Sequence, residues 1–128
     1  MPAVSKGAAG EVLAARFLRD KGYTVVAANY RSRFGEIDII ACDQKYIAFV
    51  EVKTRSENAL FLPREAVTEG KQRKILKTAL FYLQSFPTQL QPRFDVIEIL
   101  TATADPMKIL EIDHIISAYE TEGLHAAF

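Results

Sequence analysis

Three charged side chains in two neighbouring apolar segments have the types and spacing of a hydrolytic site. Residues 35–42, GEIDIIAC, contain Asp38, and residues 46–55, YIAFVEVKTR, contain Glu51 and Lys53. Because side chains alternate along a β-strand, Glu51 and Lys53 share a face about 6.6 Å apart. Carboxylate oxygens suit a hard divalent cation, and Mg²⁺ usually takes one or two of them with water and phosphate oxygens. The pattern therefore predicts metal-assisted hydrolysis.

The short connection between these segments sets their register. Residues 43–45, Asp-Gln-Lys, suit a hairpin, and a turn centred on the last two of them places Asp38 directly opposite Glu51. Glu36 then faces Lys53, so four charged groups share one face. Opposed carboxylates repel unless a proton or a cation lies between them. The alternate residues should fill the other face: Ile37, Ile39, Val50 and Val52.

An ordinary exposed ion pair would also explain Glu51 and Lys53 taken alone, and it would stabilise the fold by at most about 1 kcal/mol. The additional acid Asp38, the apolar flanks and the following Thr-Arg favour a site over an isolated pair.

Two helices and four or five strands should position these residues. Capping residues and apolar periodicity predict a first helix over 6–21, from Ser5 to Gly22, with Ala8, Val12, Ala15 and Leu18 inward. A second helix is predicted over 69–86, after Thr68. Alternation and β-branched runs predict strands over 23–30, 36–42, 46–53 and 93–100, and a weaker strand over 108–115. The order indicates an α/β (α+β) fold with helices covering a sheet, in one domain over residues 1–128.

Composition excludes several classes of protein. The 128 residues are 49% apolar with zero net charge, but residues 1–94 hold 15 Lys and Arg against 9 Asp and Glu, so an anionic partner remains compatible. No apolar run is long enough to span a membrane, and the amino terminus lacks a secretory signal, so we expect a cytoplasmic protein without a membrane partner. The single Cys42 should be a half-buried thiol, and His114 and His125 edge-strand or tail residues.

Glu11 lies on the apolar face of the first predicted helix, so it is an acid directed toward the sheet. It could be a further metal ligand, direct or through water. It could also be an acid at the rim of the packed face, neutralised by an arginine.

The start of the second predicted helix offers groups for phosphate. Gln72 lies within the first turn, where free backbone N–H groups attract anions, and Lys71 is beside it. Lys71 and Lys74 could bind a nucleic-acid backbone or could belong to a solvated helix face.

Three arginines flank the ends of the strands that carry the acids. Arg31, Arg33 and Arg55, with Tyr30 and Phe34 interleaved, could bind nucleic acid. The aromatic residues could equally serve packing.

The pattern GEIDII followed by FVEVKTR resembles the PD-(D/E)xK nuclease superfamily, and more closely the YraN-like family of predicted bacterial endonucleases, which is similar to archaeal Holliday junction resolvases. The resemblance implies a restriction-endonuclease-like mixed central sheet flanked by helices. It also implies that Asp38, Glu51 and Glu11 bind Mg²⁺ or Mn²⁺, that Lys53 is catalytic, and that Gln72 has a positioning role. Ile37 stands where the superfamily name has proline, a residue without a chemical role of its own.

These observations predict a metal-dependent endonuclease acting on DNA, with branched DNA and a homodimer suggested by the resemblance alone. The alternative from another class is a binding module for nucleic acid or protein in which the acids are structural. RNA as the substrate also remains open, because the hydrolytic groups would be the same.

Overall fold

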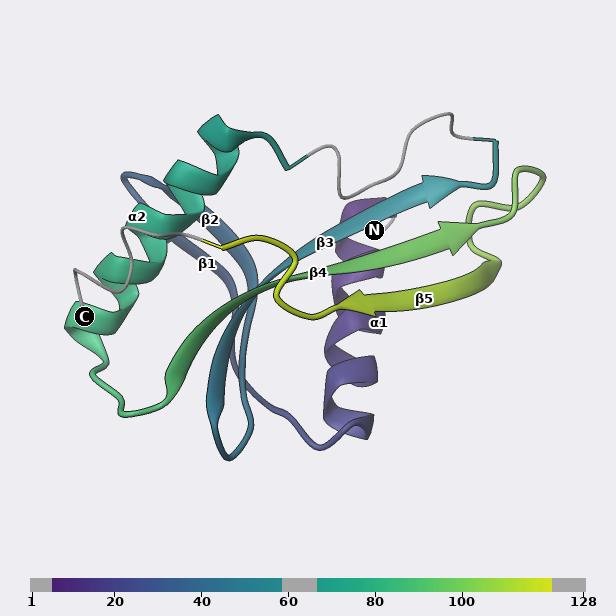
Figure 1. The fold of residues 1–128 in the computed structure, drawn as a ribbon. Helices are drawn as coiled ribbons and strands as arrows, with labels where there is room; N and C mark the ends of the chain where they lie inside the picture. The colour runs from purple at the N-terminus through teal and green to yellow at the C-terminus, as the bar shows by residue number, and fades with distance from the viewer. Residues whose placement is uncertain (1–5, 59–66, 121–128) are drawn as a thin grey trace, which may run out of the picture.

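A computed structural model of the protein describes residues 6–58 and 67–120. The elements, in chain order, are α1 (Lys6–Asp20), β1 (Thr24–Ser32), β2 (Gly35–Cys42), β3 (Tyr46–Ser56), α2 (Glu69–Ser85), β4 (Gln91–Thr101) and β5 (Ile109–Ile115), as Figure 1 shows. The predicted order α-β-β-β-α-β-β is confirmed, including the weakly indicated last strand. The expected cap Ser5 and the tail residue His125 lie outside the described residues.

The five strands form one mixed sheet in the order β1-β2-β3-β4-β5. β3 and β4 are parallel, whereas the other three neighbouring pairs are antiparallel. A parallel pair needs a crossover connection, and α2 lies in it. The α+β prediction of a mixed sheet covered by helices is therefore confirmed.

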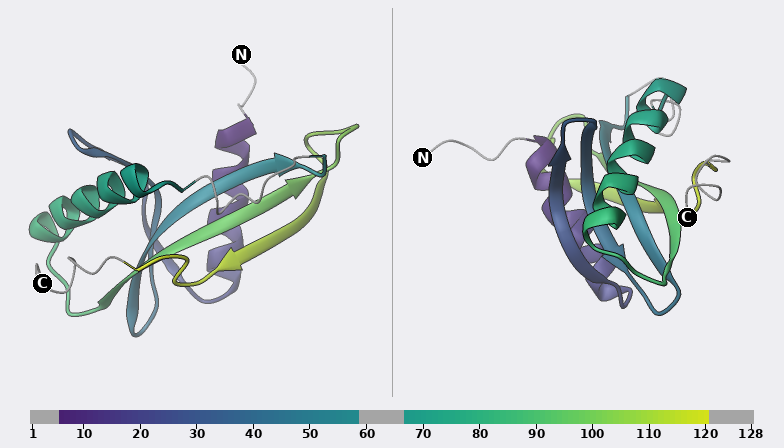
Figure 2. Two further views of the ribbon diagram at one scale, coloured as in Figure 1. Left: turned by 45° about the horizontal axis from the view of Figure 1, so that its top comes forward. Right: turned by 90° about the vertical axis from the view of Figure 1, so that its left-hand side faces the viewer.

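The two helices cover opposite faces of the sheet (Figures 1 and 2). On one face, Ala14 and Leu18 of α1 pack with Val50 and other residues of the central strands. On the other face, Ile75 and Ala79 of α2 form a second apolar cluster. The prediction that Ala8 and Val12 face the core is wrong: both are exposed, Val12 by 66%, because Ala14, Ala15 and Leu18 form the buried stripe of α1.

The β2–β3 hairpin has the predicted register as far as the strands pair. Ile39 lies opposite Val50 and Cys42 opposite Ile47, and Cys42 is half-buried as expected. The Asp43 carboxylate holds the turn by accepting hydrogen bonds from the backbone N–H groups of Lys45 (2.8 Å) and Tyr46 (2.7 Å).

Pairing between β2 and β3 ends at Ile39 and Val50, and this ending moves two residues from their expected places. Glu36 pairs with Arg31 of β1 instead of facing Lys53, because β2 continues along β1 after it leaves β3. Ile37 packs in the cluster under α2 instead of the cluster under α1. The prediction of four charged residues on one face is thus wrong for Glu36.

The backbone geometry requires glycine at two positions, one within α1 and one just after its C-terminal end. A Cβ at Gly10 would lie 2.6 Å from Thr54 Oγ1, so only glycine lets α1 approach β3 this closely. Gly22 has φ +98° and ends the helix in the left-handed conformation, as predicted.

Neither α1 nor α2 is long and apolar enough to cross a membrane, in the chain as far as it is described.

Candidate active site

Asp38 lies one residue beyond the last β2–β3 pair, at the point where the strands part. Its Oδ2 accepts a hydrogen bond from the backbone N–H of Val52 at 2.8 Å, so the carboxyl takes the place of the missing ladder partner. Burial, then the charge of Glu51, and then Glu11 raise the pKa of Asp38 from 3.8 to about 7, although the Val52 hydrogen bond acts in the opposite direction. Asp38 is therefore an acid with too little positive charge around it.

Glu51 binds two lysines from different elements. Its Oε1 lies 3.3 Å from Lys53 Nζ in β3 and 2.6 Å from Lys71 Nζ in α2. The Glu51 side chain is only 8% exposed. The N-terminal end of α2 reaches this acid because Thr68 caps the helix, accepting a hydrogen bond from the Lys71 backbone N–H at 3.2 Å.

The two lysines have opposite pKa shifts. Burial and a hydrogen bond with Lys71 lower the pKa of Lys53, although Glu51 raises it. Burial also acts to lower the pKa of Lys71, but hydrogen bonds with Glu51 and Lys53 and the charges of Glu51 and Asp38 outweigh it and raise that pKa. Lys53 is thus the amine that gives up its proton more readily, and Lys71 is the more persistent cation.

Glu11 enters the site from the N-terminal part of α1. The half-buried side chain hydrogen-bonds to Asp38 and helps to raise its pKa. The close approach of Gly10 to Thr54 brings this turn of α1 down onto β3. The sequence prediction that Glu11 points toward the sheet is therefore confirmed, and its partner is a second acid.

The donor groups fit a two-carboxylate cation site. Among residues 6–58 and 67–120, His, Cys, Asp and Glu side chains form no group of three that could hold a metal ion. Mg²⁺ and Mn²⁺ need fewer protein ligands when water and phosphate supply the rest. Asp38 has carboxylate neighbours in Glu11 and Glu51, and a nearby cation would relieve the repulsion that raises its pKa.

Residues 10–99 match a family described as Uncharacterised protein family UPF0102. The chain belongs to this family. A UPF0102 protein of Nocardia farcinica is 53% identical over 96 residues, which cover 73% of this chain and 75% of the relative. A UPF0102 protein of Chlorobium limicola is 44% identical over 122 residues, 92% of this chain and 94% of the relative. The matched region contains Glu11, Asp38, Glu51, Lys53 and Lys71.

Gln72 of this UPF0102 chain lies in the first turn of α2, as predicted. Its Nε2 donates a hydrogen bond to the backbone carbonyl of Val67 at 3.0 Å. The side-chain amide thus links the first turn of α2 to Val67, which precedes the helix cap Thr68. Its predicted role beside a phosphate remains a prediction.

The predicted nucleic-acid contacts fall in two places. Arg31 and Arg33 lie at the β1–β2 turn, where Arg31 Nε is 3.3 Å from Glu36 Oε2 in an exposed pair, and Lys74 lies on α2 next to Gly35 of the same turn. Arg55 lies farther along β3 and lines a small hollow with Glu98, Leu100 and other residues of β4 and β5. The arginines therefore do not form one surface.

A second charged cluster lies under α1 and was not predicted. Asp95 is fully buried, and its carboxylate receives hydrogen bonds from Arg93 (2.8 Å), His114 (2.8 Å) and the backbone N–H of Ser117 (3.0 Å). Lys21 Nζ lies 2.7 Å from the other ring nitrogen of His114. Burial acts to raise the pKa of Asp95, but these hydrogen bonds outweigh it and hold the pKa below its usual value. His114 is in edge strand β5, as expected.

Two further residues near the site escaped sequence analysis. Glu98 lies opposite Lys53 in the β3–β4 pair, which could not be foreseen without the parallel register. Tyr119 has a buried hydroxyl for which the described residues offer no hydrogen-bond partner, and its ring stacks on Phe94 at 5.6 Å between centroids. Burial, followed by the charges of Glu51 and Asp95, raises the pKa of Tyr119.

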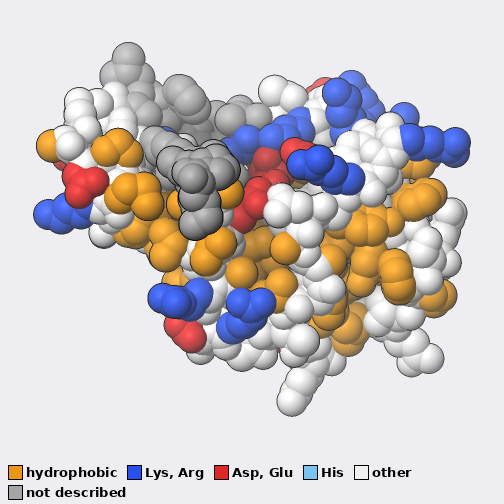
Figure 3. Space-filling view, turned by 180° about the vertical axis from the view of Figure 1, so that it is seen from behind, with side chains coloured by type: hydrophobic (Ala, Val, Ile, Leu, Met, Phe, Trp, Pro, Cys, Tyr) orange, Lys and Arg blue, Asp and Glu red, His pale blue; other side chains and the backbone are white. Residues whose placement is uncertain are grey.

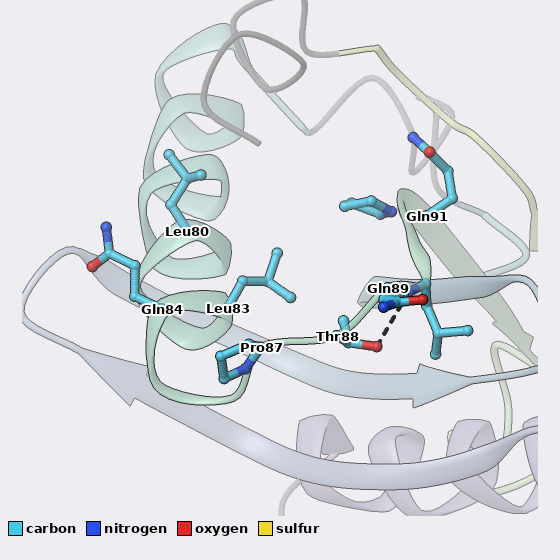
Figure 4. Close-up of a pocket in the computed structure, with 9 residues that line it drawn as sticks. Leu80, Leu83, Gln84, Pro87, Thr88, Gln89 and Gln91 are labelled. Atoms are coloured by element: carbon cyan, nitrogen blue, oxygen red, sulfur yellow. Dashed lines mark hydrogen bonds between the residues drawn. The ribbon is translucent and has the colours of Figure 1, made fainter.

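A hollow of about 450 Å³ lies at the opposite end of α2, away from the acids (Figure 4). Its lining comprises leucine, proline, glutamine and threonine side chains, among them Leu80, Leu83, Gln84 and Pro87. None of the described residues that line it has an ionisable side chain. The acids and lysines described above therefore lie outside this hollow.

Proposed function

We propose that this protein is a metal-dependent endonuclease that hydrolyses phosphodiester bonds in DNA. The observation that carries the proposal is the convergence of Glu11, Asp38 and Glu51 with Lys53 and Lys71 where β2 leaves β3. An acid with a raised pKa, such as Asp38, beside cations is typical of functional sites.

Asp38 and Glu51 would hold Mg²⁺ or Mn²⁺, with Glu11 binding directly or through water. When bound, the cation supplies positive charge for the phosphate oxygens and makes a water molecule more acidic. The carboxyl of Asp38 must lose the proton that its raised pKa favours, so cation binding and deprotonation are coupled.

The lysines would divide the remaining work. Lys53, whose pKa is lowered, would orient the attacking water and, once its ammonium has lost a proton, would accept the proton of that water as a neutral amine. Lys71, whose pKa is raised, stays charged and moves from Glu51 to a phosphate oxygen. Gln72 would position the start of α2 and does not react.

The resemblance to the PD-(D/E)xK superfamily supports this proposal. The order of elements is the one expected for the superfamily core, and Asp38 lies on β2 and Glu51 on β3. The names of the UPF0102 relatives state no reaction. Branched DNA as the substrate, and a two-fold dimer that would supply two sites for it, rest on the resemblance alone.

A non-catalytic binding module is favoured by one observation. Lys71 Nζ already lies 2.6 Å from Glu51 Oε1, so the acid has a cation without any metal. This alternative predicts DNA binding that ignores Mg²⁺ and produces no cleavage.

Cleavage assays with Mg²⁺ or Mn²⁺ test the proposal on branched DNA, linear DNA and structured RNA. Asp38→Ala and Lys53→Ala should each lower the rate by about 100-fold or more. A wild-type rate in either purified variant would overturn the proposed mechanism. Metal titration by calorimetry is the companion measurement, and Glu51→Gln should bind the metal ion with lower affinity than the wild type.

A further inference from the structure

The turn between β1 and β2 presents aromatic rings beside α2. The rings of Phe34 in this turn and Phe81 in α2 meet edge to face, with centroids 6.1 Å apart. The guanidinium carbon of Arg33 lies 4.9 Å from the centroid of the Phe34 ring. Phe81 is 39% exposed, and Arg33 is also exposed. We refer to Arg33, Phe34 and Phe81 as the aromatic platform.

The platform is held at a defined distance from the acids. Lys71 of α2 binds Glu51, whereas Phe81, ten residues later on the same helix, binds Phe34. At 1.5 Å per helical residue, these positions are about 15 Å apart. Phe34, in the turn just before β2, precedes Asp38 by four residues, which corresponds to about 13 Å of extended chain. The two estimates agree.

The hairpin and the helix are also joined between these two ends. Ser32 Oγ donates a hydrogen bond to Thr78 Oγ1 at 3.4 Å. A Cβ at Gly35 would touch both Lys74 and Thr78 at 3.4 Å. The β1–β2 hairpin thus lies beside α2, as Figures 1 and 2 show, and the platform and the acids belong to one supported surface.

The surfaces on the two sides of the acids differ in charge, and this difference determines along which of them a bound polyanion extends. Toward β5, the hollow that Arg55 lines also contains Glu98, Glu111 and Asp113. Toward the platform, α2 and the hairpin carry mainly cations, namely Lys71, Lys74, Lys77, Arg31 and Arg33. Figure 3 shows acidic side chains near the middle of one face of the molecule, with Lys and Arg side chains around them. A phosphate backbone is therefore drawn along α2 to the platform.

The platform has the chemistry of a base-stacking surface. Every nucleobase has a π-face, and aromatic rings and guanidinium groups bind it without reading sequence. A base in a duplex has both faces covered by its neighbours, so only an unpaired base can bind in this way. Packing of the turn on α2 explains why Phe34 is half-buried, but not why Phe81 remains exposed beside it.

We propose that the aromatic platform stacks an unpaired nucleobase of a strand whose phosphodiester lies at the acids, so that the substrate has a single-stranded stretch next to the cleaved bond. At about 3.4 Å per stacked nucleotide, the stacked base is about four nucleotides from that bond, and fewer if the strand is stretched. The inference rests on the proposed endonuclease function for the position of the bond.

The test measures binding with EDTA present, so that cleavage does not interfere. The probes are a single-stranded oligonucleotide with 2-aminopurine at successive positions and a duplex of the same sequence. Phe81→Leu keeps an apolar side chain and should weaken single-strand binding about tenfold, with loss of 2-aminopurine quenching, while duplex affinity changes less than twofold. Phe81→Trp should retain both signals.

Phe86→Leu is the matched control. Phe86 caps the same helix and is 57% exposed, but its ring contact is with Tyr82 and not with the hairpin. This variant should bind both probes like the wild type, and circular dichroism should show that all variants are folded. Unchanged single-strand affinity in Phe81→Leu, or equal weakening for the two probes, would overturn the platform. Selective weakening in a protein that cuts no nucleic acid with Mg²⁺ or Mn²⁺ would support the platform and reject the endonuclease.

Discussion

Asp38 on β2 and Asp95 on β4 are both acids within the sheet, but their surroundings differ in the balance of charge. Asp95 is completed by Arg93, His114 and a backbone N–H, and its pKa is below the usual value. Asp38 has one backbone N–H and two neighbouring acids, and its pKa is raised to about 7. The same residue type is thus stabilising in one place and costly in the other.

The balance of charge around a buried acid distinguishes a structural acid from a functional one better than its degree of burial does. A carboxylate whose hydrogen bonds are all made contributes to the fold and has nothing left to bind. A carboxyl crowded by other acids persists at the expense of stability, and such groups concentrate where a ligand or cation completes them. The Asp95 cluster is therefore a structural clamp, whereas Asp38 belongs to the candidate active site.

Removal of Asp95 should have the largest effect on stability. Asp95→Ala leaves Arg93 as a buried cation without its partner and should lower the free energy of unfolding by about 3–5 kcal/mol in urea titrations. The matched variant is Asp38→Asn, which removes a repelling charge and keeps an acceptor for Val52. Its stability should equal or exceed that of the wild type at pH 8. Equal losses in both variants would erase the distinction between the two regions.

A change at Gly10 should disturb the candidate active site by moving α1. Gly10→Ala places a methyl group 2.6 Å from Thr54 Oγ1, and such overpacking should cost about 1–3 kcal/mol, partly offset by about 1 kcal/mol of helix propensity. Glu11, the next residue, would be displaced from Asp38, so the proposed DNA cleavage should fall more than stability does. Thr54→Ser added to Gly10→Ala keeps the hydroxyl that limits the approach of α1, so this second change should not restore the activity lost in Gly10→Ala. Full activity in Gly10→Ala would show that Glu11 need not be held so closely.

The two aspartates should give stability opposite dependences on pH. The folded pKa of Asp38, about 7, exceeds the ordinary value of 3.8, so its contribution is fully present below pH 3.8 and is lost as the pH rises to about 7. Asp95 has a depressed pKa, so its contribution is present above its ordinary pKa and is lost as the pH falls further. Urea unfolding at pH 5 and pH 8 should show a smaller decline for Asp38→Asn than for the wild type. Parallel pH profiles would contradict the raised pKa of Asp38.

The smallest effect is expected at Glu36, which the sequence had suggested as part of the charged face. Its pair with Arg31 is exposed, with side chains 59% and 76% accessible, so Glu36→Gln should change stability by less than about 0.5 kcal/mol. Cleavage and metal binding should also remain unchanged, as measured beside Glu51→Gln. A loss of metal affinity in Glu36→Gln would return this residue to the site.

The candidate site was predictable in its ingredients and only partly in its assembly. Alternation and the turn at Asp43 gave the correct β2–β3 register, and apolar periodicity on α1 directed Glu11 toward the sheet. The contact of Lys71 with Glu51 was not foreseen, because it joins α2 to β3 and depends on where the helix begins relative to that strand.

Sequence alone determined the order of elements, their approximate ends and the hairpin register, because these depend on neighbours in the chain: side-chain alternation, helix caps and turn residues. Tertiary structure decided where β2 leaves β3, and with it the fates of Asp38 and Glu36. It also decided that His114 of β5 completes Asp95 of β4. The physical reason is that strand twist and helix packing are set by the whole core, so convergence of distant side chains is not encoded in any one segment.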